Sequence, residues 1–321
     1  MSDAPDVLVL RRAAHGMSTE LLADALRERL PDRDVVRAGT PDEEERLIEH
    51  APVVVGHDLR SDLLEAAADL RLFACASAGV GHLPQAELED KGVVVTNASG
   101  VHGPNIAEYV LGNVLVFTRD LHESWRRKER GEWRHHQARE LKGSTVTVVG
   151  LGSIGQAIVE RLDPFDVHTV GVRYTPSKGG PTDEVVGFDG ADFHDALART
   201  DYLVLACPLT ETTRGLVDEA AFVTMPRDAV LVNVGRGPIV DTDALVDAIK
   251  GNVIRGAALD VTDPEPLPEG HDLWTMENVL VTPHNSGHTP EYYPRLADIV
   301  ASNLRRVDES GDYADVENRV V

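Results

Sequence analysis

The sequence predicts an α/β protein with two doubly wound parallel-sheet domains, and three observations lead to this fold class. The chain has 321 residues, 42% of them hydrophobic, which is enough for two domains that each have a core. Short valine-rich segments alternate with helical patterns along the chain, as parallel strands joined by helices do. The alternation falls into two series, separated by a long helical stretch over residues 104–132.

The first series occupies the N-terminal third of the chain. Its strands are expected at residues 7–10, 35–37, 53–55, 72–74 and 93–96. Each is a short apolar run bounded by polar or turn residues, which is typical of a strand buried on both faces. Helices are expected between them, near residues 19–29, 61–67 and 84–90.

The second series follows the long helical stretch. Its strands are expected at residues 145–149, 169–172, 202–205, 229–233, 256–259 and 279–282. A last helix, about residues 291–309, comes after the second sheet is complete, so we expect it to cross back onto the first. The predicted domains are therefore 1–101 with 289–321, which is discontinuous, and 102–288, with a cleft between them.

The charge balance argues against nucleic acid as a partner. The chain has 54 acidic and 31 basic residues, a net charge of −23, and only five lysines. A surface this acidic resembles that of proteins adapted to multimolar salt, where self-repulsion is screened. The alternative is an ordinary acidic cytosolic protein, in which runs such as residues 42–45 are solvated helix faces.

The sequence gives no support for membrane insertion or secretion. No apolar run approaches the roughly 20 residues of a membrane span, and the N-terminus has no signal-peptide pattern. The two cysteines, Cys75 and Cys207, are too few for a disulfide framework or a metal site. We expect buried thiols, no metal, and a cytoplasmic location.

A glycine-rich turn points to a nucleotide. Gly150, Gly152 and Gly155 follow an apolar β-branched strand and precede a helical pattern, which is the context that a dinucleotide-binding turn requires. The helix would begin near Ser153 and Ile154 and offer amide N–H groups to phosphates. The alternative is a strand–turn–helix junction that binds nothing.

The end of the next strand bears on which dinucleotide binds. An acidic residue for the ribose 2′-hydroxyl normally stands about 20 residues after the glycines. This chain has Arg173, Tyr174 and Thr175 there, followed by Ser177 and Lys178. Arg173 could pair with a 2′-phosphate, so the sequence favours NADP over NAD. If Arg173 only stacks on the adenine, both cofactors remain usable.

Seven stretches in order resemble the D-isomer-specific 2-hydroxyacid dehydrogenase family over nearly the whole chain. They are SAGVGHLP from Ser77, HGPNIAEYVLG from His102, the glycine turn, CPLTETTRGLV from Cys207, NVGRGPIVD from Asn233, ALDVTDPEP from Ala258 and TPHNSGHT from Thr282. The resemblance implies a Rossmann cofactor domain and a flavodoxin-like substrate domain.

Three residues in these stretches suit the reduction of a 2-keto acid. Arg236 could hold the carboxylate and the carbonyl oxygen with its planar fork. His284 is the expected acid–base, because an imidazole titrates near neutrality, and Glu265 would orient it. The alternatives are a surface salt bridge for Arg236, an ordinary surface or core histidine for His284, and a solvated turn for Glu265.

The resemblance also implies substrate and cofactor contacts. The substrate carboxylate would be held by the backbone of Ala78, Gly79 and Val80, with His102 beside the substrate. Gly103 and His288 would lie at the hinge, where an ordinary surface role is the alternative for His288. The remaining cofactor residues would be Ile106, Cys207, Pro208, Thr213, Val234, Asp260 and His284.

The expected function is reversible NAD(P)-dependent reduction of 2-keto acids to D-2-hydroxy acids, with the preferred acid left open. Glu265 argues against a formate dehydrogenase-like activity. A phosphoglycerate or phosphite dehydrogenase and a dinucleotide-sensing corepressor both remain alternatives. Residues 107–132, with Trp125 and with Trp133 just beyond, resemble the family's dimerisation arm, so we expect a homodimer; an interdomain linker is the competing interpretation.

Overall fold

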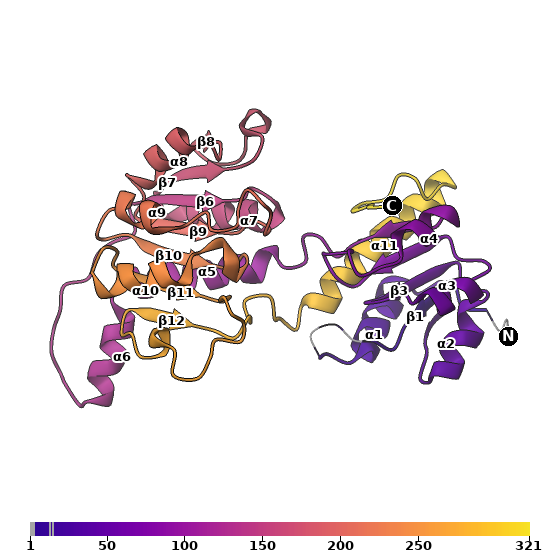
Figure 1. Ribbon diagram of the computed structural model, residues 1–321. Coiled ribbons are helices and arrows are strands. Elements are labelled where there is room, and N and C mark those ends of the chain that lie inside the picture. The colour runs from indigo at the N-terminus through magenta and orange to yellow at the C-terminus, as the bar shows by residue number, and fades with distance from the viewer. Residues whose placement is uncertain (1–3, 13, 15) are drawn as a thin grey trace. The chain divides into compact units, whose positions relative to one another are not determined.

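The computed structural model describes residues 4–12, 14 and 16–321. The chain divides into two compact units (Figure 1). Unit 1 combines Met1–Val101 with His288–Val321, and unit 2 is the continuous segment His102–Gly287. Each unit contains one sheet whose strands all pair in parallel, so the predicted fold class is confirmed.

Unit 1 has a five-stranded sheet in the order β2-β1-β3-β4-β5, which is the order of flavodoxin-like folds. Its strands are β1 (Val7–Val9), β2 (Val35–Arg37), β3 (Val53–Gly56), β4 (Leu72–Cys75) and β5 (Val94–Thr96). All five lie within two residues of their expected positions. They are short and almost wholly buried, because helices cover both faces of the sheet.

The helices of unit 1 include one that the sequence analysis did not predict. They are α1 (Thr19–Arg29), α2 (Pro41–Ile48), α3 (Ser61–Ala66), α4 (Gln85–Asp90) and α11 (Tyr292–Ser310). The unpredicted helix is α2, which contains the acidic run at residues 42–45. That run is not simply a solvated face, because Glu44 is buried and accepts the backbone N–H of Arg11 at 2.6 Å.

Helix α11 returns to unit 1, as the sequence predicted. Its buried face, which includes Tyr292 and Leu296, belongs to the same apolar cluster as Leu22 and Leu26 of α1. The strand residues Val7 and Val9 complete that cluster, while Leu8 between them faces a second cluster on the other side of the sheet. The C-terminal helix therefore covers one face of the first sheet.

Unit 2 has a seven-stranded sheet in the order β12-β11-β10-β9-β6-β7-β8. Its strands are β6 (Thr145–Val149), β7 (His168–Val172), β8 (Glu184–Val186), β9 (Tyr202–Leu205), β10 (Val230–Asn233), β11 (Gly256–Leu259) and β12 (Val279–Val281). Counted within the unit, this is the 3-2-1-4-5-6 order of a dinucleotide-binding sheet extended by one strand. Strand β8, at the edge, was not predicted.

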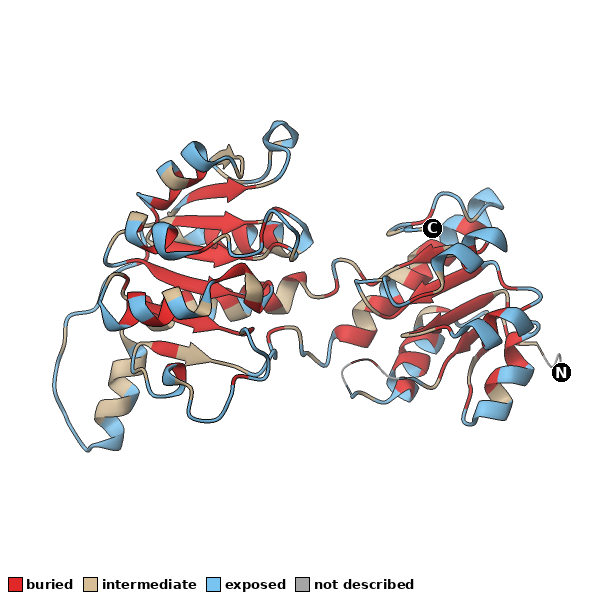
Figure 2. Cartoon of the chain, in the orientation of Figure 1, coloured by how far each residue is buried: buried red, intermediate tan, exposed pale blue. Residues whose placement is uncertain are grey.

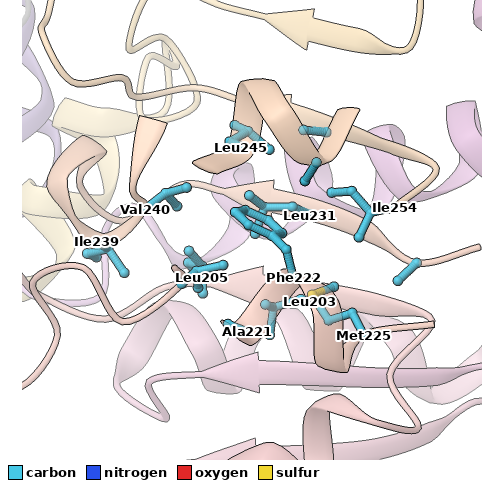
Figure 3. Packing of buried hydrophobic residues seen from close by; sticks show 14 of the residues in the cluster. Leu203, Leu205, Ala221, Phe222, Met225, Leu231, Ile239, Val240, Leu245 and Ile254 are labelled. Carbon is cyan, nitrogen blue, oxygen red and sulfur yellow. The ribbon is translucent and has the colours of Figure 1, made fainter. Parts of the chain in front are cut away.

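Helices cover both faces of this second sheet. The helices of unit 2 are α5 (Gly103–Thr118), α6 (Leu121–Glu129), α7 (Ser153–Leu162), α8 (Gly190–Leu197), α9 (Glu219–Thr224) and α10 (Thr242–Lys250), and all but α6 pack on the sheet; short 3-10 turns lie at Asp163–Phe165, Pro176–Lys178, Gly237–Ile239 and Asp272–Trp274. Figure 3 shows Leu203, Leu205 and Leu231 of the sheet packed beneath Phe222 of α9 and Leu245 of α10. The intervening strand residues face α5 and α7.

The long helical stretch expected over residues 104–132 is two helices rather than one. Asp120 breaks it by adopting a left-handed conformation, with φ of 50°. Arg255 holds the break, because its guanidinium donates to the carbonyl oxygen of Phe117 at 2.6 Å and to the Asp120 carboxylate at 2.7 Å. The second helix, α6, stands away from the sheet (Figure 1), and none of its residues is buried (Figure 2).

No helix among residues 4–12, 14 and 16–321 is both long and apolar enough to cross a bilayer.

Candidate active site

The predicted site residues of unit 2 follow the carboxyl ends of successive strands in the sheet. His284 lies beyond β12, Asp260 and Glu265 beyond β11, and Arg236 beyond β10. Across the same edge, Cys207 and Pro208 follow β9, the glycine turn follows β6, and residues 173–175 follow β7. Open α/β sheets bind their ligands at this edge, so the sheet order places the predicted residues on one side of the unit.

The glycine turn after β6 has the geometry that its sequence predicts. Gly150 has φ of +97°, and a Cβ there would lie 2.8 Å from the backbone of Cys207. A Cβ on Gly155 would lie 1.9 Å from the carbonyl oxygen of Gly150, so only glycine lets helix α7 begin this close to the strand. Gly152 is the N-cap residue, and no side chain caps α7 within the described chain, so its first amides face outward from the turn.

A cavity of about 440 Å³ opens beside this turn. Eight predicted cofactor residues line it: Gly150, Gly152, Arg173, Tyr174, Thr175, Cys207, Pro208 and Thr213. Lys178, singled out as a nearby donor, lines it too. Leu151, Phe188, Thr210 and Thr212 also contribute and were not predicted. The two threonines and Leu151 had a sequence signal, since they belong to the CPLTETTRGLV stretch and to the glycine turn, whereas Phe188 had none.

The charge of the cavity is opposite to that of the chain. Its lining includes the cations Arg173 and Lys178 and, among the described residues, no carboxylate. The guanidinium of Arg173 is held at this edge because Nη1 donates to the carbonyl oxygen of Gly179. Tyr174 beside it is 81% exposed. On a protein with a net charge of −23, such a cavity fits a polyanion such as a dinucleotide phosphate.

The floor of the cavity is built from buried polar and thiol groups. The Thr213 hydroxyl donates to the carbonyl oxygen of Pro208 at 2.7 Å and accepts the N–H of Thr210 at 2.8 Å, which closes this loop on itself. Burial raises the pKa of the Cys207 thiol to about 11, so the thiol is neutral at physiological pH. Neither group adds negative charge to the cavity.

Arg236 lies in a turn that requires glycine on both sides. A Cβ on Gly235 would lie 2.8 Å from the carbonyl oxygen of Cys207, and one on Gly237 would lie 1.9 Å from that of Thr262. The second contact packs this turn against the loop that carries Glu265. Arg236 itself is exposed, and its Nη1 donates to the carbonyl oxygen of Gly235 at 2.7 Å. Its guanidinium forms no ion pair with any described residue.

The structure brings His284 and Glu265 together. Nδ1 of His284 lies 2.7 Å from Oε1 of Glu265, and since a carboxylate only accepts, the imidazole donates. Both side chains are about half exposed, at 49% and 42%. His284 has φ of 51°, in the left-handed region that residues other than glycine seldom adopt. Because Nδ1 is engaged, Nε2 is the ring nitrogen left to exchange a proton.

The other predicted cofactor residues of unit 2 lie outside the cavity lining. Ser153 and Ile154 form the start of α7, while Ile106 and Val234 are buried in the core cluster beneath α5. Asp260 is 1% exposed, and its carboxylate accepts hydrogen bonds from residues 282–286. His102 is the N-cap residue of α5, and its ring lies 3.4 Å from where a Cβ of Gly287 would stand.

In unit 1, the predicted carboxylate-binding turn leaves its amides available. The carbonyl oxygens of Ala78, Gly79 and Val80 accept from the side chains of Asn97, Ser77 and Gln85. The N–H groups of the same three residues donate to no partner within the part of the chain that the structure describes. His288, the first residue of the second segment of unit 1, is exposed.

No group of three or more histidine, cysteine or acidic side chains in the described residues could hold a metal ion. The residues present fit a nicotinamide dinucleotide instead, because close-packed glycines, an uncapped helix start and a carboxylate-free basic cavity meet at one sheet edge.

Comparison with known proteins agrees with this geometry. Residues 111–286 match the family profile described as D-isomer specific 2-hydroxyacid dehydrogenase, NAD binding domain. A glyoxylate reductase of Thermofilum pendens is 35% identical over 251 residues, which cover 76% of this chain and 74% of the relative. A D-3-phosphoglycerate dehydrogenase of Methanocaldococcus jannaschii is 32% identical over 91% of this chain but only 53% of its own length.

Among solved structures, a D-isomer specific 2-hydroxyacid dehydrogenase from Xanthobacter autotrophicus Py2, in complex with NADPH and MES, matches with a TM-score of 0.77. It is 28% identical, and the match covers 99% of this chain and 98% of that one. The profile spans more than half of the chain, and the Thermofilum relative is 35% identical over 74% of its own length. The chain therefore belongs to the D-isomer-specific 2-hydroxyacid dehydrogenase family of NAD(P)-dependent oxidoreductases.

Proposed function

We propose that this protein reduces 2-keto acids to D-2-hydroxy acids, reversibly, with NADPH preferred over NADH. One observation carries the proposal: a hydrogen-bonded His284–Glu265 pair, the exposed Arg236 and a basic nucleotide-sized cavity follow successive strands of one sheet. The family and the glyoxylate reductase among its relatives support the reaction class.

His284 and Glu265 would act as the acid–base pair. The nicotinamide, when bound, supplies hydride to the carbonyl carbon. Nε2 of His284 holds the proton that the developing alkoxide needs, while the Glu265 carboxylate fixes the ring through Nδ1. In the oxidising direction the same nitrogen accepts the hydroxyl proton.

Arg236 and the turn at residues 78–80 would bind the substrate. The guanidinium can donate to the carboxylate and to the carbonyl oxygen together, which polarises the carbonyl toward hydride. Arg236 is exposed and forms no ion pair with the described residues, so a substrate carboxylate does not have to displace an acidic side chain of the described chain. The amide N–H groups of Ala78, Gly79 and Val80 are suited to bind the carboxylate. The carbonyl oxygens of the same residues already accept hydrogen bonds from other side chains, which fixes the turn.

The preference for NADPH rests on the absence of a carboxylate at the end of β7. Arg173 and Lys178 supply positive charge in the lining of the cavity, and no acidic side chain among the described lining residues would repel a 2′-phosphate. The Xanthobacter relative was solved with NADPH, which agrees with this assignment. NAD remains the second cofactor to test.

A phosphoglycerate-type dehydrogenase is the second candidate, favoured by the Methanocaldococcus relative. The His284–Glu265 pair serves either reaction, so substrate tests must decide. A dinucleotide-sensing binding protein would keep the cofactor cavity and show no turnover.

The first experiment follows absorbance of reduced nicotinamide in multimolar KCl with glyoxylate, hydroxypyruvate, pyruvate and phenylpyruvate, using NADPH and NADH in turn. Oxidation of 3-phosphoglycerate is followed with both oxidised cofactors. We expect turnover of at least one keto acid with NADPH. Glu265→Gln should lower kcat by roughly 10- to 100-fold, because removal of an orienting carboxylate frees the ring.

The matched control is Asp69→Asn. Asp69 accepts from the exposed His50 at 3.0 Å, so this variant breaks a similar histidine–carboxylate pair that lies in unit 1. Its kcat should equal that of the wild type. Cofactor binding without turnover of any acid would instead support the sensing protein, and turnover of 3-phosphoglycerate alone would support the second candidate.

We further propose a cytoplasmic homodimer that works at high salt. Helix α6 buries none of its residues, and Trp125 is 54% and Trp133 is 95% exposed. Exposed aromatic side chains of this kind fit an arm that packs against a second copy of the chain. Both cysteines are free, which suits a reducing compartment. The net charge of −23 supports the salt adaptation.

A further inference from the structure

Two polar side chains on one face of α5 bind the segment that carries His284. Asn105 and Tyr109 lie one helical turn apart. The side-chain amide of Asn105 donates to the carbonyl oxygen of Ser286 at 2.7 Å, and the Tyr109 hydroxyl lies 2.6 Å from the hydroxyl of Thr282. The helix therefore holds the segment at both ends, on either side of His284.

A buried carboxylate binds the same segment from the sheet. Oδ1 of Asp260 accepts the Thr282 hydroxyl at 2.6 Å and the amide N–H of Asn285 at 2.8 Å. Oδ2 accepts the amide N–H of Ser286 at 3.0 Å and also the Ser286 hydroxyl. With 1% of its surface exposed, Asp260 is buried against this segment.

These bonds have a defined direction. The Thr282 hydroxyl has one proton, and it gives that proton to the Asp260 carboxylate, which can only accept. Thr282 must therefore accept from Tyr109, so the phenol donates. Burial raises the pKa of the Tyr109 hydroxyl, which keeps the phenol protonated and able to donate through the neutral range. Hydrogen bonds therefore run from the Tyr109 hydroxyl on α5, through the Thr282 hydroxyl, to the buried Asp260 carboxylate.

His284 needs such support because of its backbone conformation. Its φ of 51° lies in a region that costs energy for a residue with a side chain, and such a conformation persists only where the surroundings impose it. Its amide N–H donates to the carbonyl oxygen of Asp260 at 2.8 Å, and the residues on both sides are bound by α5 and Asp260. Loosening either end would let the imidazole drift from its place beside Glu265.

We propose that Tyr109 and Asn105 are positioning residues for the acid–base His284, with Tyr109 acting through Thr282 and Asp260. The inference rests on the proposed function for its catalytic meaning, while the holding of residues 282–286 can be measured without turnover. It assigns a task to the first two turns of α5, the helix that begins at the start of unit 2.

The test compares Tyr109→Phe with Tyr202→Phe. Tyr202 is a matched control, because its hydroxyl lies 2.7 Å from that of Thr118, near the other end of α5, and does not contact residues 282–286. The first measurement is amide hydrogen exchange of the cofactor-free protein, read by mass spectrometry. Exchange over residues 282–286 should quicken in Tyr109→Phe and stay at the wild-type rate in Tyr202→Phe.

The second measurement is steady-state kinetics with the best keto acid from the panel. Tyr109→Phe should lower kcat about tenfold and leave KM for the keto acid and cofactor affinity within roughly twofold, because a misplaced proton donor slows the chemical step rather than binding. Asn105→Ala should act in the same direction. In a Thr282→Val background, Tyr109→Phe should add nothing, since the phenol acts through that hydroxyl.

The outcomes separate the two proposals. Unchanged exchange over residues 282–286 in both Tyr109→Phe and Asn105→Ala overturns the inference, whatever the activity. Faster exchange with unchanged kcat overturns it as well, since the segment would then be held for stability alone. A wild type that turns over no substrate overturns the proposed function, and faster exchange in Tyr109→Phe would still support the holding of the segment by α5.

Discussion

Arg173 and His284 show how single residues at this sheet edge take their properties from their surroundings. The guanidinium of Arg173 lines a cavity to which no described residue contributes a carboxylate, and a backbone carbonyl oxygen anchors it there. His284 is oriented from two directions, since its ring is bound by Glu265 and its backbone by Asp260. Each side chain is held in place before any ligand binds. A substitution of Arg173 should therefore affect cofactor binding, and a substitution of His284 should affect the chemical step.

At Arg173, charge reversal should change the choice of cofactor. In Arg173→Asp a carboxylate replaces the cation at the proposed ribose site, so it should repel a 2′-phosphate and accept a hydrogen bond from a 2′-hydroxyl. KM for NADPH should rise roughly 10- to 100-fold, as expected for losing a hydrogen bond to a charged group, and KM for NADH should fall. Initial rates across a range of both cofactors check this.

Arg227→Asp is the control for charge alone, since Arg227 also donates to a backbone carbonyl oxygen but lies outside the cavity lining. It should leave the cofactor ratio unchanged. If Arg173→Asp leaves that ratio unchanged too, the 2′-phosphate assignment is wrong.

At the scale of elements, the junction between α5 and α6 depends on contacts from distant parts of the chain. Asp120 takes its left-handed conformation where Arg255, at the start of β11, binds the end of α5. His122 lies two residues further on, and the centroid of its ring is 5.0 Å from that of Phe117. Its Nδ1 is buried and has no hydrogen-bond partner among the described residues. The stability of the junction should therefore depend on whether the His122 imidazole is protonated.

Burial lowers the pKa of His122 below its usual range, and the nearby Arg126 and Arg255 act in the same direction, against the opposing effect of Asp120. The unfolded chain then binds a proton more readily than the folded one, so stability falls as pH drops below about 6.5. His122→Gln should remove this loss, narrowing the difference in Tm between pH 8 and pH 5. Thermal unfolding followed by circular dichroism at both pH values measures it.

The control is His50→Gln. His50 is exposed and bonded to Asp69, which raises the pKa of the imidazole, so its protonation does not destabilise the fold at pH 5. Equal behaviour of the two variants would contradict the role assigned to His122.

The sequence alone was enough to place most strands, because valine-rich runs between turn residues have few other interpretations. It also predicted that Glu265 meets His284, through the family resemblance, and the structure has them bonded. Helix α2 was not predicted, although Thr40 caps it and Pro41 is its first residue. Its acidic run leaves only Leu47 and Ile48 as an apolar face, which is too short to give a clear helical pattern.

Other features depend on contacts that no local pattern contains. The break at Asp120 needs Arg255, which is 135 residues away in the sequence. Strand β8 is a three-residue edge strand with no buried residue, so it lacks the apolar signal of its neighbours. The support of His284 by Tyr109 depends on a pairing across 173 residues. These are the parts of the fold and site that only the structure could supply.

For the whole molecule, net charge sets the conditions under which it folds. Repulsion at −23 opposes compaction, and salt weakens it by shortening the Debye length from about 10 Å at 0.1 M to about 3 Å at 1 M. Tm should therefore rise with KCl up to molar concentrations. Differential scanning calorimetry across a KCl series checks this.

A variant with Glu65, Glu89 and Glu309 replaced by Gln removes exposed charges that form no ion pair among the described residues. Its Tm should depend less steeply on KCl. A wild-type Tm that stays flat or falls as KCl is added would contradict the proposed salt adaptation.

The proposed homodimer has its own test in Trp133. Because this side chain is 95% exposed in the single chain, Trp133→Ser should cost the monomer little stability. It should shift sedimentation at micromolar concentration from dimer toward monomer. The control is Trp274→Ser, since Trp274 is 52% exposed but lies outside the arm. A wild type that sediments as a monomer would contradict the proposal.

The strand order β12-β11-β10-β9-β6-β7 has one more consequence, for how such enzymes diverge. Arg173 and His284 follow strands five steps apart, roughly 24 Å at the usual spacing between strands. Mutations that retune the cofactor choice proposed for one end are thus insulated from the proton chemistry proposed for the other. A lineage could trade NADPH for NADH through a few changes after β7 and inherit its catalytic apparatus intact.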